Sequence, residues 1–156
     1  MNRKLADVLL AEDNPSDAEL ILDSLASVVE PKHVHRVHDG VEAIDFLSCK
    51  GDYTSRLPGT PLRLVLLDIK LPRIDGLEVL EHIRADSQTS LVPVVMLTSS
   101  KVDRDVRSAY ELGANAFVQK PVDFPRFREA LRCLATFGLS INEGAPLVGL
   151  PTPGGP

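Results

Sequence analysis

The fold of this chain is decided by the stretch LVLLDIKLP, residues 64–72. Its first four residues are all apolar, which is typical of a strand that is buried on both faces in a parallel sheet. Asp68 ends this strand. In open parallel sheets, ligands bind in the crevice outside the carboxyl ends of the strands. The stretch therefore predicts a parallel sheet whose most apolar strand presents a carboxylate at the centre of such a crevice.

Similar apolar runs recur along the chain, and helix-like segments alternate with them. Strands are predicted near residues 5–11, 33–38, 63–68, 93–97 and 115–119. Helices are predicted to begin at Pro15 with Asn14 as cap, at Asp39 or Gly40, and after Gly76, and to cover about 101–112 and 124–137. This alternation predicts an α/β fold, a doubly wound parallel sheet with crossover helices on both faces.

The composition excludes several classes of protein. A chain of 156 residues with 44% apolar content fits one globular domain. The net charge of -5 provides no basic surface for nucleic acid. No apolar run approaches the ~20 residues that cross a bilayer, and the chain does not begin like a signal peptide, so we expect a cytoplasmic protein without membrane association. Cys49 and Cys133 lack CxxC spacing and are expected to be ordinary reduced thiols.

Polar side chains also follow the other predicted strands at the points where these end. Glu12 and Asp13 follow the first strand, Thr98 follows the fourth, and Lys120 follows the fifth. Singly, each has an ordinary interpretation, such as a solvated acid, a helix cap or a surface lysine. Because the carboxyl ends of parallel strands meet at one edge, we expect them to join Asp68 in one crevice. Three acids, a hydroxyl and an ammonium predict a site for a cation and a phosphoryl group.

The acidic cluster needs a positive partner, because two like charges ~4 Å apart repel by roughly 4 kcal/mol at an effective dielectric of about 20. A site with only two or three carboxylates, completed by water and a backbone carbonyl, matches the coordination that Mg²⁺ prefers, and Mn²⁺ is a tolerated substitute. Asp68 is then the predicted nucleophile for phosphorus, and Lys120 would offset charge on the transferred group. Thr98 would offer its hydroxyl to a phosphoryl oxygen. No base stands ready to activate water, which favours a long-lived phosphorylated form with slow self-dephosphorylation.

Four groups of residues together form a recognisable pattern. They are Glu12-Asp13-Asn14-Pro15, Asp68-Ile69-Lys70-Leu71-Pro72 with Asp75-Gly76, Thr98-Ser99-Ser100, and Lys120-Pro121. Over residues 5 to 137 the chain resembles a response-regulator receiver domain of two-component signalling. The resemblance implies a flavodoxin-like fold of five strands in the order 2-1-3-4-5, with five helices. It also implies a standalone regulator that accepts a phosphoryl group from a histidine kinase and acts through protein contacts.

The resemblance also assigns roles within the site. Asp68 would be the phosphoacceptor, and Mg²⁺ would be held by Asp13, Asp68 and the backbone carbonyl of Lys70, with Glu12 reaching the metal through water. Thr98 and Phe117 would form the switch, with the Phe117 ring turning from exposed to buried. The Lys120–Pro121 bond would be cis.

Two segments depart from the family pattern. The connection at residues 49–61 is long, and residues 138–156 form a Gly/Pro-rich tail with several apolar residues after a receiver domain at 1–137. This shape resembles small standalone regulators that serve phytochrome-type sensor kinases. The apolar tail also suggests a homodimer.

Two other functions stay open at this point. One is a magnesium-dependent phosphatase that uses an aspartyl phosphate, although Lys70 occupies the position where such enzymes usually place a second acid. The other is a receiver-like scaffold that binds partners without phosphorylation.

Overall fold

A computed structural model describes residues 7–57, 62–99, 103–120 and 123–141 of the chain. These residues contain a five-stranded parallel sheet with the strand order β2-β1-β3-β4-β5. The strands are β1 (Val8–Ala11), β2 (Val34–Val37), β3 (Leu64–Asp68), β4 (Val94–Thr98) and β5 (Ala116–Gln119). The predicted strand order is confirmed.

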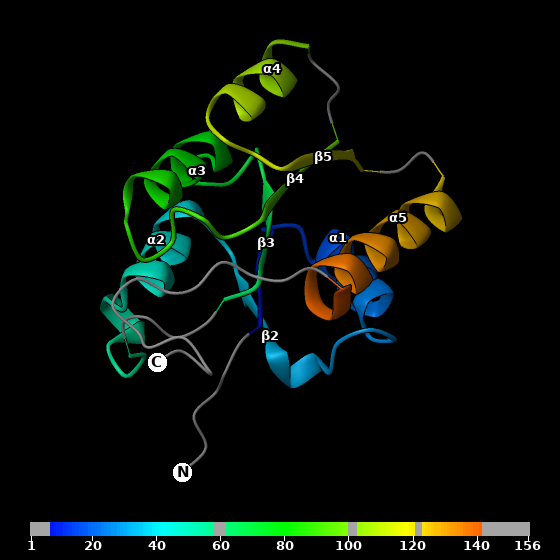
Figure 1. Ribbon diagram of the computed structural model, residues 1–156, viewed down its shortest axis with the longest axis horizontal. Helices are drawn as coiled ribbons and strands as arrows, with labels where there is room; N and C mark the ends of the chain where they lie inside the picture. The colour runs from blue at the N-terminus through cyan, green and yellow to red at the C-terminus, as the bar shows by residue number, and fades with distance from the viewer. Residues whose placement is uncertain (1–6, 58–61, 100–102, 121–122, 142–156) are drawn as a thin grey trace, which may run out of the picture.

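Helices cover both faces of this sheet, as Figure 1 shows. They are α1 (Pro15–Leu25), α2 (Gly40–Ser48), α3 (Gly76–Ala85), α4 (Asp103–Glu111) and α5 (Phe124–Thr136). One apolar core joins α2, α3 and α4 to one face of the sheet, and a second joins α1 and α5 to the other. The predicted doubly wound α/β architecture is therefore confirmed.

The central strands are apolar because both of their faces are covered. Every residue of β1, β3 and β4 is buried, whereas the edge strand β5 is only partly buried. Side chains of β3 alternate between the two cores: Val65 and Leu67 belong to one, and Leu64 and Leu66 to the other. This double burial fixes β3 in the middle of the molecule and holds its last residue, Asp68, at the carboxyl edge of the sheet.

Side-chain caps fix where four of the helices begin. The side chains of Asn14, Asp39, Asp75 and Asp123 each accept a hydrogen bond from the backbone N–H three residues further on. Such caps satisfy donors that a helix leaves unpaired at its N-terminus. Since α1 and α3 follow the acidic ends of β1 and β3, these caps also fix the loops around the crevice.

The long connection after α2 packs against the edge strand β2. It contains a 3₁₀ turn, Gly51–Tyr53, and the Tyr53 hydroxyl lies 2.9 Å from the ring nitrogen Nε2 of His35 and donates to Glu42. The His35 ring stacks on Phe46, and the Arg56 guanidinium lies 3.8 Å from the centre of the same Phe46 ring. The described part of this segment thus has a structural role: it covers the side of α2 and β2.

Several predicted boundaries shift by a few residues. Strand β1 begins at Val8, and His33 belongs to a 3₁₀ turn, Pro31–His33, and not to β2. The last helix continues as a π-helical turn, Phe137–Ile141, in which Leu139 packs on the core between the sheet, α1 and α5. Residues 142–156 of the predicted tail and Pro121 of the predicted cis bond lie outside the described residues. Within the described ranges, no helix has the length and apolar character needed to cross a bilayer.

Candidate functional site

Three acidic side chains meet at the carboxyl edge of the sheet. Strands β1 and β3 are neighbours with Ala11 opposite Leu67, so Glu12 and Asp68 leave the sheet side by side. One carboxylate oxygen from each of Glu12, Asp13 and Asp68 lies within 4.8 Å of the others, a spacing that could hold a metal ion. The structure thus brings together the three acids that the sequence predicted to converge.

These acids differ in their access to water. Glu12 is fully buried and Asp68 is 5% exposed, whereas Asp13 is exposed at the mouth of the pocket. Oxygen ligands that combine buried and open positions suit a cation that keeps part of its water shell, as Mg²⁺ does. The donor set therefore fits a hydrated divalent cation.

Lys120 enters the same pocket from the end of β5. Its backbone N–H donates to the Thr98 carbonyl over 2.6 Å, which extends the pairing of β4 with β5 up to the crevice. Its Nζ lies 2.9 Å from Asp68 Oδ2 and 3.1 Å from Asp17 Oδ2, and it also contacts Glu12 Oε1. The ammonium is therefore bound by carboxylates from β3, from the first turn of α1 and from the loop between β1 and α1.

The close packing of these charges changes their protonation. Burial, followed by the hydrogen bond to Asp68, raises the pKa of Glu12 to about 7, despite the opposing effect of Lys120. Burial lowers the pKa of Lys120, but its hydrogen bonds to Glu12 and Asp68 outweigh this and raise the pKa above the ordinary lysine value. Lys120 thus stays a cation at neutral pH, whereas Glu12 gains or loses its proton close to neutral pH.

The loop after β3 holds the Asp68 carboxylate from its other side. The backbone N–H of Lys70 donates to Asp68 Oδ1 over 3.2 Å, while Lys120 binds Oδ2. Helix α3 begins so close to this strand end that a Cβ at Gly76 would lie 2.0 Å from the Asp68 carbonyl oxygen, so only glycine fits there. The role of the Lys70 carbonyl as a metal ligand stays a prediction.

Of the two predicted switch residues, Thr98 ends β4 and Phe117 lies within β5. Thr98 is 1% exposed at the end of β4, next to the exposed Ser99. Phe117 is partly buried and packs against the core formed with α2, α3 and α4. Its ring therefore lies between the exposed and buried positions that the resemblance implies.

Two contributors to the site were missed from the sequence. Asp17 binds Lys120, although an acid in the first turn of a helix is too common to signal this. Arg36 of β2 donates from Nε to the Glu12 carbonyl over 3.1 Å and from Nη2 to the Asp13 carbonyl over 3.4 Å. Arg36 lies in a strand that also contains His35, so no local signal in the sequence marked it. Its bonds anchor the loop that carries the two acids.

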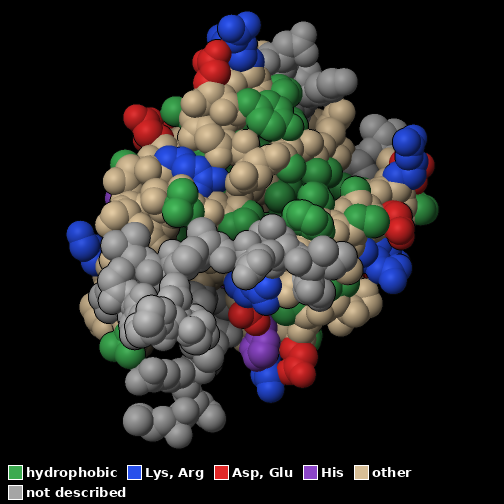
Figure 2. All heavy atoms as spheres, viewed as in Figure 1, with side chains coloured by type: hydrophobic (Ala, Val, Ile, Leu, Met, Phe, Trp, Pro, Cys, Tyr) green, Lys and Arg blue, Asp and Glu red, His purple; other side chains and the backbone are tan. Residues whose placement is uncertain are grey.

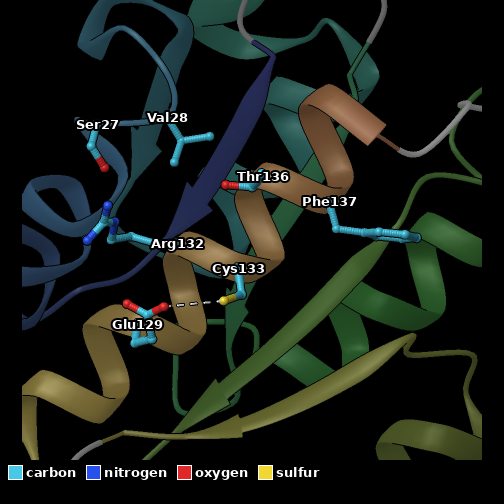
Figure 3. Close-up of a pocket in the computed structure, with 7 residues that line it drawn as sticks. All are labelled: Ser27, Val28, Glu129, Arg132, Cys133, Thr136 and Phe137. Atoms are coloured by element: carbon cyan, nitrogen blue, oxygen red, sulfur yellow. Dashed lines mark hydrogen bonds between the residues drawn. The ribbon is translucent and has the colours of Figure 1, made fainter.

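A separate cavity of about 440 Å³ lies between α5 and the turn that follows α1 (Figure 3). It is lined by Ser27, Val28, Glu129, Arg132, Cys133, Thr136 and Phe137. The Cys133 thiol donates to Glu129 across 3.7 Å, and both Cys133 and Cys49 are free, as predicted. None of the predicted site residues lines this cavity.

The fold and the site together define a class: small parallel α/β proteins with an acidic pocket and a lysine at the carboxyl edge of the sheet. Residues 8–132 match the model of the response regulator receiver domain. The chain belongs to this family.

Individual relatives narrow the comparison. The chain is 33% identical over 136 residues to the probable methanogenesis regulatory protein FilR2 of Methanothrix harundinacea, covering 87% of this chain and 85% of FilR2. It is 36% identical over 114 residues to the response regulator Rcp1 of Synechocystis, covering 72% and 75%. The phosphorylated cyanobacterial phytochrome response regulator RcpA superposes with a TM-score of 0.80 at 33% identity, covering 88% and 96%. The homologues of this chain thus include small standalone phytochrome-associated regulators.

One solved structure bears on the metal. The Mn²⁺-bound form of Rcp1 superposes with a TM-score of 0.79 at 29% identity, covering 88% of this chain and 97% of Rcp1. Receiver domains bind Mg²⁺ at an acidic site, and this chain has such an acidic cluster.

Proposed function

We propose that this protein is a standalone response regulator in which Asp68 accepts a phosphoryl group from the phosphohistidine of a sensor histidine kinase. One observation carries the proposal: Lys120 Nζ lies 2.9 Å from Asp68 Oδ2, inside a pocket whose three acids lie close enough to share a cation. An ionised carboxylate next to a fixed ammonium is the arrangement that phosphoryl transfer to aspartate requires.

In the proposed reaction, an oxygen of Asp68 forms a bond to phosphorus. At the same time the bond from phosphorus to the donor's imidazole nitrogen breaks, and its electron pair returns to the imidazole. Lys120 donates to an oxygen of the moving group and offsets its charge, and the Thr98 hydroxyl donates to another. The Phe117 ring then moves from its partly buried position into the space that Thr98 leaves.

The metal in this proposal is Mg²⁺, held by Asp13, Asp68 and the Lys70 carbonyl, with Glu12 acting through water. When bound, it supplies positive charge for the phosphoryl oxygens. The exposed position of Asp13 and the buried positions of Glu12 and Asp68 support this assignment.

The proposed output is protein contact through the face formed by α4, β5 and α5. Figure 2 shows hydrophobic side chains gathered between α4 and α5. Tyr110 and Phe124, which flank β5 in sequence, are 51% and 60% exposed. We propose that this face supports a homodimer. We also propose that the kinase partner is phytochrome-type, on the basis of the similarity to the phytochrome response regulator RcpA. The protein would act in the cytoplasm, where ATP is available to the kinase as the source of the phosphoryl group.

Phosphorylation by a small donor tests this function. Incubation with acetyl phosphate and Mg²⁺ should add one hydroxylamine-labile phosphoryl group, visible by mass spectrometry. Asp68→Asn and an excess of EDTA should each abolish the addition. Asp23→Asn, at an exposed position of α1, should leave it unchanged.

Two results would contradict the proposal. Absence of a mass gain in the wild-type protein, combined with partner binding identical to that of Asp68→Asn, would support a phosphorylation-independent scaffold. Steady release of phosphate from a phosphate ester, many turnovers per chain, would support the phosphatase.

A further inference from the structure

Three carboxylates surround the ammonium of Lys120 in the described part of the chain. They come from Glu12, Asp17 and Asp68, and the two hydrogen bonds to Asp17 and Asp68 measure 3.1 and 2.9 Å. A lysine ammonium has three N–H donors and no acceptor. Two of these donors are used in the hydrogen bonds to Asp17 and Asp68, and Glu12 forms an ion pair with the same ammonium before any phosphoryl group arrives.

Asp17 differs from the other two partners. Its side chain is 39% exposed, whereas the side chains of Asp68 and Glu12 are 7% and 0% exposed. The group of acids that could hold a metal, among the described residues, does not include Asp17. Its carboxylate can return to water at low cost, which a buried carboxylate cannot do.

The start of α1 does not depend on the Asp17 carboxylate. The backbone N–H of Asp17 donates to Asn14 Oδ1 over 3.0 Å, and this helix cap uses only main-chain atoms of Asp17. Replacement by asparagine keeps the size and the backbone contact, and it removes only the charge. The loss of an acid next to the helix dipole costs about 0.3–1 kcal/mol.

A phosphoryl group on Asp68 brings a charge of about −1.5 to −2 and three strong acceptor oxygens. The donor that now binds Asp68 can pass to a phosphoryl oxygen, but Asp17 still holds the ammonium at 3.1 Å and so competes with the new oxygens for its position and charge. From this geometry we propose that Asp17 is a positioning residue for Lys120. The Asp17 carboxylate competes with the phosphoryl group for the Lys120 ammonium and so weakens the phosphorylated state. This inference rests on the proposed function of Asp68.

The test uses beryllium trifluoride, a stable mimic of a phosphoryl group on a carboxylate, with the full chain and saturating Mg²⁺. Fluorine NMR titration gives its affinity. Asp17→Asn should bind the anion roughly two- to fivefold more tightly, the size expected for loss of a partly exposed competing ion pair. The matched control is Glu19→Gln, which removes one charge from an exposed position on the same helix and should change the affinity much less.

A second measurement separates competition from a structural effect. Calorimetry gives the Mg²⁺ affinity without the anion, and Asp17→Asn should not increase it, because Asp17 contacts Lys120 and not the metal-binding acids. A merely structural role would weaken both the anion and the metal. Equal or weaker anion binding in Asp17→Asn, or an equal gain in Glu19→Gln, would overturn the inference while leaving Asp68 as phosphoacceptor. A wild-type protein that takes up neither the anion nor a phosphoryl group would overturn the proposed function, and the inference with it.

Discussion

Glu12 combines full burial with a charged neighbourhood more than any other residue of the pocket. Its carboxylate contacts Lys120, its Oε2 accepts from the Asn14 backbone N–H at 3.4 Å, and its carbonyl accepts from Arg36. Burial and the neighbouring Asp68 nevertheless raise the pKa of Glu12 to about 7. Ionising Glu12 is therefore costly without a further cation, which is a reason for this pocket to bind one.

The raised pKa of Glu12 predicts how stability depends on pH. Between its ordinary value of 4.5 and about 7, the folded protein keeps a proton that the unfolded chain has lost. Stability from this proton is fully present below pH 4.5 and is lost as the pH rises through about 7. The side chain in Glu12→Gln cannot titrate, so the free energy of unfolding of this variant should fall less than that of the wild type as the pH rises through this window. The difference between the two should be a few kcal/mol at most.

Urea unfolding in EDTA at a series of pH values checks this prediction. Lys120 stays charged across the whole window because its pKa is raised, so it adds no slope of its own. Glu19→Gln at the surface of α1 serves as the control and should follow the wild-type curve. Parallel curves for wild type and Glu12→Gln would show that the pKa of Glu12 is not raised.

Among the elements, α3 is tied to the start of β4 and the end of α4 by one side chain. Arg84 donates to the carbonyls of Gly113, Ser90 and Val92 over 2.9, 3.0 and 2.6 Å, and to Asn115 Oδ1 over 2.9 Å. Gly113 has φ of 102°, the left-handed conformation that ends α4. Arg84 thus fixes the C-terminal end of α4 against α3, far along the helix from the crevice.

We predict that Arg84→Met destabilises the protein by about 2–4 kcal/mol, because it leaves carbonyls without their charged donor. Chemical denaturation measures this loss. Arg107→Met removes an arginine from α4 whose side chain is 82% exposed and which pairs only with Glu111 among the described contacts, so it should cost no more than about 0.5 kcal/mol. A similar loss in both variants would contradict a special role for Arg84.

At the scale of the whole molecule, the proposed partner surface is the face of α4, β5 and α5. Strand β5 is one of the two edge strands and, like the other edge strand β2, is only partly buried. Apolar residues exposed on both sides of such a strand favour association, because contact removes them from water.

If this face forms the proposed homodimer, the double variant Tyr110→Ser/Phe124→Ser should be monomeric. Light scattering should give the wild type about twice the 17.0 kDa of one chain, and the variant a mass near 17.0 kDa. Leu91→Ser, at a position that is 68% exposed between α3 and β4, is the matched control and should remain dimeric. A monomeric wild type, with or without acetyl phosphate, would exclude this assembly.

The sequence by itself determined the elements and their order, because these follow from local patterns. Continuous apolar runs predicted strands that are buried on both faces, and capping residues such as Asn14 and Asp39 predicted where helices begin. Polar residues at strand ends, Asp68 above all, also marked the crevice, since parallel strands bring their carboxyl ends together.

Only the tertiary structure decided which side chains share the charge of Lys120. Asp17 lies 103 positions from Lys120 in the sequence, and nothing in its local pattern distinguishes it from any other acid in a first helical turn. The same holds for Arg36 at the acidic loop and for the carbonyls around Arg84. Such contacts depend on the distance and direction between elements that pack together, and these are fixed by the two cores and not by any short stretch of the chain.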